Sequence, residues 1–164
     1  MQARGILTRF REDHAGLRDR LREWSAALNQ AADGSYGQCQ HAVTILSGVC
    51  LFFEYETTHH FREEETALYA AVGQKLPRLR GLVAELQDEH DVIRQGLEEF
   101  RRGLGHFNTS GEVGDLPRRG QELIVRLRRH MDREEKELHP VVLREFKEED
   151  WVELRRLFAD SEVA

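Results

Sequence analysis

The sequence of 164 residues contains few of the residues that mark extracellular, membrane-embedded or irregular proteins. Its two cysteines, Cys39 and Cys50, lack CxxC spacing, so we expect two reduced thiols in a helix rather than a disulfide or zinc ribbon. Only three prolines interrupt the chain. No apolar run approaches the roughly 18 residues that a membrane span needs, and we therefore expect no membrane partner.

The chain also lacks an excess of basic residues. Its 30 acidic residues outnumber 24 basic ones and give a net charge of −6. This balance argues against nucleic acid as a general partner. Residues 1–5 hold no apolar signal core, so a cytoplasmic protein is predicted. No Ser/His/Asp set and no glycine-rich phosphate loop stands out, and the sequence assigns neither a catalytic residue nor an oligomeric state.

Helical periodicity is what the sequence does have, in a chain that is 40% hydrophobic and 33% charged. Apolar positions recur at steps of three and four, which is the spacing of one buried helix face. We expect turns at 33–35 and 108–114, a third helix starting at Pro77 and a fourth following Pro117. A short fifth helix over 148–158 is expected to cover one end with Trp151 and Leu154. The four stripes are Ile6, Phe10, His14, Leu17, Leu21, Trp24 and Leu28; Phe53, Thr57, His60, Glu64, Leu68 and Val72; Leu82, Leu86, His90, Ile93, Leu97, Phe100 and Leu104; and Leu123, Leu127, His130, Glu134, Leu138 and Val142.

The two halves of the chain repeat one another. The first and third stripes have the same steps at a shift of 76 residues, which places His14 over His90, and each histidine follows an acidic pair. The second and fourth stripes match at a shift of 70 residues, which places His60 over His130. The repeat predicts two helical hairpins, about 5–76 and 78–146, within a single domain spanning 1–164. Four helices with short connections predict an all-α, up-down-up-down four-helix bundle.

Six polar side chains interrupt the apolar stripes, and they predict a metal site. Residues four apart on a helix point in nearly the same direction. The histidine of the second helix, like that of the fourth, can therefore point to the same place inside the bundle as the glutamate one turn later. Buried carboxylates need a cation or a dense hydrogen-bond network. If both glutamates bridge two metals and each metal binds two imidazoles, each metal has four protein ligands. An oxo or hydroxo bridge supplies a fifth ligand, which leaves one open position on each octahedral metal. Such donors suit iron, manganese or zinc. The predicted ligands are His14, His60, Glu64, His90, His130 and Glu134.

Other polar residues near the predicted site leave alternatives. His59 and Glu63 have the same spacing as His60 and Glu64, but the downstream core aligns with that of the fourth helix only if His60 matches His130. Glu56 is either an added ligand or an acceptor behind the ligands, and Tyr55 either reaches the site or packs elsewhere. The remaining polar neighbours are expected on solvated faces or behind the ligand imidazoles (Glu63, Glu65 and Glu135), and three histidines are expected at the surface (His41, His106 and His139).

Over about residues 5–146 the chain resembles the hemerythrin-like, or HHE, cation-binding domains. The resemblance rests on Glu12-Asp13-His14, Glu89-His90 and the segments from His60 to Glu65 and from His130 to Glu135. It implies a non-haem centre of two iron ions joined by an oxo or hydroxo bridge, with Glu64 and Glu134 as bridging carboxylates.

Two departures from the oxygen-carrying hemerythrins shape the functional hypothesis. Arg94 stands where the carriers place a further histidine, and the carriers' last carboxylate would correspond to Glu135 rather than Glu134. The four-His, two-Glu set is more similar to bacterial relatives that handle nitric oxide, peroxide or iron-centre damage. We therefore expect a di-iron protein whose partner is a small diatomic or peroxide ligand. An iron or oxygen sensor, an iron-storage or repair protein, and an oxidase or oxygenase on an organic substrate are the alternatives.

Overall fold

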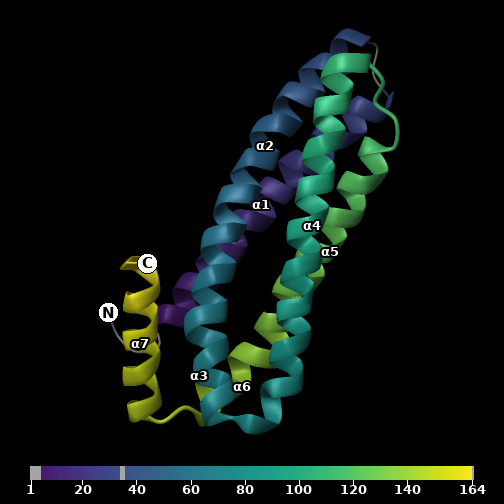
Figure 1. Cartoon of the computed structure of the whole chain (residues 1–164). Coiled ribbons are helices and arrows are strands. Elements are labelled where there is room, and N and C mark those ends of the chain that lie inside the picture. The colour runs from purple at the N-terminus through teal and green to yellow at the C-terminus, as the bar shows by residue number, and fades with distance from the viewer. Residues whose placement is uncertain (1–4, 34–35, 164) are drawn as a thin grey trace.

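The computed structural model describes residues 5–33 and 36–163, and within these ranges every regular element is helical (Figure 1). The bundle is built from α1 (Gly5–Asp33), α2 (Tyr36–Glu63), α4 (Arg80–Ser110) and α5 (Leu116–Arg133). Two of these helices are prolonged, α2 by η1 (Glu64–Tyr69) and α3 (Ala70–Lys75), and α5 by η3 (Glu134–Leu138) and α6 (His139–Glu145). A 3₁₀ turn, η2 (Pro77–Leu79), leads into α4, and α7 (Glu148–Val163) ends the described chain.

The four long helices form an elongated ring in which each packs on two neighbours. α1 contacts α2 and α5, and α4 contacts the same two helices. Successive helices run in opposite directions, as Figure 1 shows. The predicted all-α bundle is therefore confirmed, and Cys39 and Cys50 lie buried on α2 as thiols.

The helix ends follow from local chemistry and correct one expected turn. Pro77 begins the 3₁₀ turn before α4, where its missing N–H costs nothing. α4 runs through Ser110, so residues 108–110 are helical rather than part of a turn. It stops at Gly111, whose φ of 75° lies in the left-handed region that glycine adopts without a Cβ clash. The turn at 33–35 includes residues 34 and 35, which lie outside the described residues.

Both prolonged helices contain a π-helical segment, η1 and η3, which the sequence reasoning did not predict. From His60 onward the buried positions step by four repeatedly, and the same holds from His130. In an α-helix each step of four advances the face by about 40°, so such a run would drift off the core. The wider π turn absorbs this drift, and the buried positions stay in line: His60, Glu64, Leu68, Val72 and Leu76, and His130, Glu134, Leu138, Val142 and Phe146.

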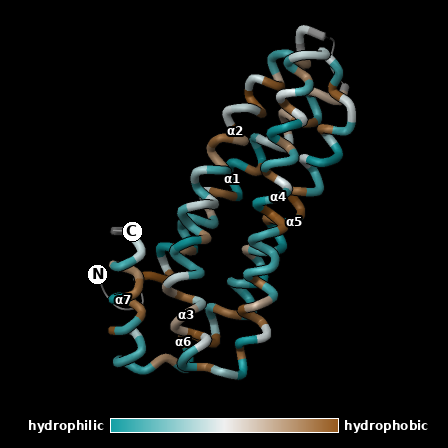
Figure 2. Tube along the Cα trace, in the orientation of Figure 1, coloured by the Kyte–Doolittle hydropathy of each residue, from teal (hydrophilic) through white to brown (hydrophobic). Residues whose placement is uncertain are grey.

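The interior is divided into two apolar clusters, which we name the long core and the short core. The long core fills the bundle from Leu17 of α1 to the far turns, with Trp24, Phe53 and Phe100 at its centre. The short core lies at the other end and contains residues of η1, α3, η3, α6 and α7. In Figure 2, hydrophobic residues (brown) recur between hydrophilic ones (teal) along the helices. Among the described residues, no helix is long and apolar enough to cross a membrane.

The fifth helix is longer than predicted and lies elsewhere. α7 extends to Val163, five residues beyond the predicted end. It packs along the flank of the bundle against η1 and α3, rather than across the end (Figure 1). Trp151 and Leu154 are buried there, as expected.

Candidate metal centre

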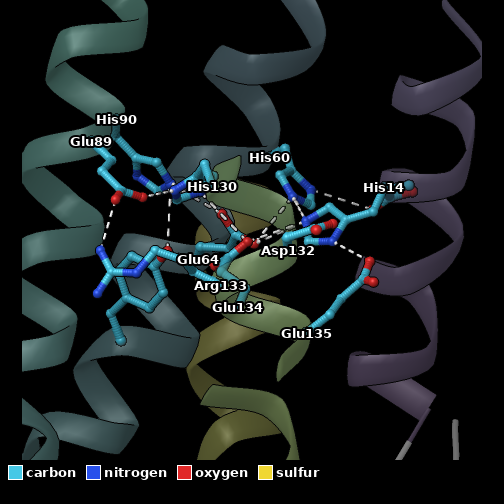
Figure 3. Close-up of polar contacts among 12 residues, drawn as sticks. His14, His60, Glu64, Glu89, His90, His130, Asp132, Arg133, Glu134 and Glu135 are labelled. Carbon is cyan, nitrogen blue, oxygen red and sulfur yellow. Dashed lines mark hydrogen bonds and ion pairs between the residues drawn. The ribbon is translucent and has the colours of Figure 1, made fainter. Parts of the chain in front are cut away.

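The six predicted ligands meet in the middle of the bundle, at the boundary between the long and short cores. His14 comes from α1, His90 from α4, and the two His/Glu pairs from the junctions of α2 with η1 and of α5 with η3. All six side chains are at most 5% exposed. Figure 3 shows them converging from the four helices.

The imidazoles form two pairs that are joined by the carboxylates. The Nε2 atoms of His14 and His60 are 3.0 Å apart, and those of His90 and His130 are 2.9 Å apart. Glu64 reaches both pairs, with Oε1 3.1 Å from His60 Nε2 and Oε2 3.3 Å from His90 Nε2. Glu134 Oε2 also reaches both pairs, at 3.2 Å from His14 Nε2 and 3.5 Å from His130 Nε2. Each carboxylate therefore spans the two histidine pairs.

Three of the four imidazoles are oriented by a carboxylate on their outer nitrogen. Nδ1 of His14 lies 2.9 Å from Glu135, that of His90 2.7 Å from Glu65, and that of His130 3.0 Å from Glu89. A carboxylate in this position keeps the proton on Nδ1 and leaves the Nε2 lone pair facing inward. Glu65 and Glu135 thus orient imidazoles, which was one of the two roles predicted for them.

An arginine closes over each of these three carboxylates. Arg94 donates to Glu65 at 2.8 Å, Arg18 to Glu135 at 2.8 Å and Arg133 to Glu89 at 2.7 Å. We call each His–Glu–Arg set a clamp. His60 has no such clamp, because Asp13 Oδ2 lies 3.6 Å from its Nδ1, too far for a hydrogen bond.

The donor set fits a metal cation. Two nitrogen ligands about 2.1 Å from one cation and at right angles to it lie about 3.0 Å apart, which is the spacing within each histidine pair. Both oxygens of Glu64 and Oε2 of Glu134 are buried without a hydrogen-bond partner. Buried acceptors of this kind are costly unless a cation satisfies them. Within the part of the chain that the structure describes, two groups of side chains are close enough to hold an ion, and Glu64 belongs to both: His14, His60, Glu64 and Glu134, and Glu64, His90 and His130.

The electrostatics of the site also call for positive charge. Burial lowers the pKa of His14, but the nearby carboxylates of Glu134 and Glu64, 3.2 and 3.8 Å from its Nε2, outweigh burial and raise this pKa to about 9. Burial raises the pKa of Glu64, but the neighbouring imidazoles, His60 foremost, hold it well below its usual range. Such firmly charged carboxylates inside a core need protons on the imidazoles or a metal cation.

Two aromatic residues beside the site were not identified from the sequence. The Tyr69 hydroxyl donates to Glu134 Oε1 at 2.6 Å, and its ring stacks on His90. His139 was expected at the surface, but it is fully buried, stacks on His14 and has no partner at either ring nitrogen. The shift of 70 residues that relates the second and fourth helices also places Tyr69 over His139, and this correspondence was the available signal.

The other candidates lie outside the cluster of six predicted ligands. His59 and Tyr55 are exposed and contact one another, and Glu56 lines a surface pocket beside them. Glu63 is buried at the wall of the same pocket and accepts a hydrogen bond from Arg9 at 2.9 Å, so it neither lies on a solvated helix face nor hydrogen-bonds an imidazole. His41 and His106 are exposed, as expected.

The comparison with protein families agrees with this geometry. The hemerythrin HHE cation binding domain matches residues 5–142, a span that includes all six predicted ligands. The chain therefore belongs to this family and is a metal-binding protein, and its buried His/Glu cluster has the composition and spacing to hold a cation. No curated protein shows a significant match to the chain.

Proposed function

We propose that the protein holds two iron ions in this site and that the pair binds or reduces a small oxidant such as oxygen, peroxide or nitric oxide. The supporting observation is that two histidine pairs are spanned by two carboxylates, Glu64 and Glu134. Imidazole with carboxylate is a donor set that suits iron. When bound, the iron pair supplies the electrons that the oxidant accepts.

Each half of the site offers two imidazoles and at least one carboxylate, so the protein alone would not saturate a metal at either position. Arg94, at the position where oxygen carriers have a further histidine, ion-pairs with Glu65 and lies over the Phe61 ring, 5.4 Å from its centroid. Each histidine pair therefore supplies two nitrogens. Neither set would fill an octahedral coordination shell, so an external ligand could bind at both positions, which favours electron transfer over reversible binding.

Aromatic side chains pack against the predicted ligands and hold their rings in place. Phe61 stacks on His90 at 3.7 Å between ring centroids, and Phe10 packs edge-on against His60. Burial and the nearby carboxylates raise the pKa of Tyr69, so its hydroxyl stays protonated and donates a hydrogen bond to Glu134 Oε1, which leaves Oε2 to face the histidines. Walls of this kind restrict access to small molecules.

Anaerobic loading followed by oxidant addition tests the proposal. We expect about two iron ions per chain by elemental analysis, and rapid oxidation of the di-ferrous protein by at least one of oxygen, peroxide and nitric oxide in stopped-flow absorbance. One firmly bound zinc without a second metal would contradict the di-iron site. An oxygenated form that persists for hours and is reversed under vacuum would identify a carrier. Loaded protein inert to all three oxidants would favour the sensor or storage alternative.

A further inference from the structure

His60 differs from the other three predicted ligand histidines at its outer nitrogen. Clamps hold the Nδ1 atoms of His14, His90 and His130, as described above. The Nδ1 atom of His60 is buried and has no hydrogen-bond partner, although the side chain is only 5% exposed. Its ring is therefore the one among the four that no clamp prevents from turning.

The unclamped side of His60 faces a surface pocket. This pocket, between α1 and α2, has a volume of about 320 Å³, and His60 forms part of its wall. Four carboxylates and one further histidine line it: Glu12, Asp13, Glu56, Glu63 and His59. Arg9 is the one cationic side chain on its wall, and it pairs with Glu63 at 2.9 Å. We call this feature the acidic pocket.

The other half of the chain provides an internal comparison. The repeat shifts of 76 and 70 residues carry the acidic pocket onto a pocket of about 170 Å³ between α4 and α5. There, Val92 stands in place of Gly16, and Arg126 and Arg129 replace Glu56 and His59. The position of Glu63 is taken by Arg133, which closes the clamp on His130. The corresponding pocket is thus smaller, has two arginines alongside its two carboxylates, Asp88 and Glu89, and does not include its histidine in the wall.

From this asymmetry we infer that the acidic pocket is the route by which a divalent cation reaches the metal centre, with His60 as the ligand that turns to pass it inward. The inference rests on the metal centre proposed above. A pocket lined by carboxylates raises the local concentration of cations and their rate of capture. A hydrated ferrous ion would accept such oxygen ligands, and the imidazoles farther inside would then replace its water.

The spacing of the acidic groups suits passage rather than storage. Among the described residues, the groups close enough to hold an ion are the two inside the bundle, and neither includes Glu12, Glu56 or His59. A cation in the acidic pocket would therefore meet carboxylates that attract it without enclosing it. Because the acidic pocket would bind the cation more weakly than the metal centre, the cation would move from the pocket to the centre.

Rates of metal uptake test this route separately from the proposed function. Apo-protein is mixed anaerobically with ferrous ion, and uptake is followed by stopped-flow competition with a chromophoric chelator. The test variant is Glu12→Gln/Glu56→Gln. The matched control is Glu99→Gln/Glu122→Gln, which removes two carboxylates from another pocket of about 240 Å³ on α4 and α5. We expect uptake about tenfold slower in the test variant alone, with the final iron content unchanged.

A second variant addresses His60 itself. Asp13→Glu adds the methylene that Glu89 has at the corresponding position, which allows a hydrogen bond to Nδ1 of His60. We expect slower uptake and slower release to a chelator, again with unchanged iron content. Equal uptake rates in the wild type and the Glu12/Glu56 variant, or equal slowing in the control, would overturn the route. Failure of the wild type to load iron would instead contradict the proposed di-iron centre.

Discussion

At the scale of single residues, the adjacent histidines His59 and His60 lie in opposite environments. His60 Nε2 faces His14 and Glu64 inside the bundle, whereas His59 is exposed beside Tyr55. We expect His60→Ala to lose at least one metal ion per chain, because one histidine pair is then reduced to a single nitrogen. His59→Ala is the matched control and should retain the wild-type content. Elemental analysis of both variants after identical loading is the measurement, and equal loss would refute the assignment of His60.

His139 supplies a second prediction at this scale. Its ring lies between Phe10 and His14, both its nitrogens lack partners, and burial lowers its pKa. His139→Phe keeps a planar ring and removes the unsatisfied polar atoms, so we expect the free energy of unfolding to rise by about 1 kcal/mol. Urea denaturation of the metal-free protein measures the change, with the exposed His106→Phe as control. A loss of stability would show that the His139 nitrogens do have a partner.

At the scale of elements, α7 stabilises the end of the molecule that holds the short core. Trp151 is 3% exposed and packs edge-on against Phe146, while the adjacent Val152 is 52% exposed. We expect Trp151→Ala to lower the free energy of unfolding by about 3–5 kcal/mol, the range for large aromatic side chains removed from a core. Val152→Ala should change it little. Chemical denaturation of both variants checks this, and similar values for the two would contradict the packing of α7.

The helices also show what periodicity predicts and what it misses. Apolar positions spaced three and four residues apart predicted four long helices. The residues of the four stripes are buried in the structure, except for Leu82, which is half-buried. The π-helical segments were not predicted, because buried positions spaced four residues apart are also typical of an ordinary α-helix over a short stretch. The repeat placed His14, His60, His90 and His130 together, while their role as ligands stays a prediction. Tyr69 and His139 were not predicted, because they occupy equivalent positions of the repeat but differ in residue type.

At the scale of the whole molecule, metal binding is expected to contribute strongly to stability. The centre buries two carboxylates and four imidazoles, and Glu64 has no hydrogen-bond partner at either oxygen. A cation that binds only the folded chain adds about 2.7 kcal/mol when its free concentration is a hundred times its Kd. We expect chelation to lower the unfolding temperature by at least about 5 °C in calorimetry. Unchanged temperatures, with metal loss verified by elemental analysis, would contradict a metal-stabilised fold.

The division of the interior into two cores bears on how the chain opens. The long and short cores meet at a polar layer, with Phe10 of the short core and Leu17 of the long core on either side of His14. The polar layer contributes little apolar contact between the two cores. The bonds of a bound cation to its ligands would therefore be the main interaction that joins the two ends of the bundle. Amide hydrogens on both sides should then exchange together in the loaded protein, through one global opening. After the metal leaves, we expect the amides around α6 and α7 to exchange first, because that end can open while the long core stays folded.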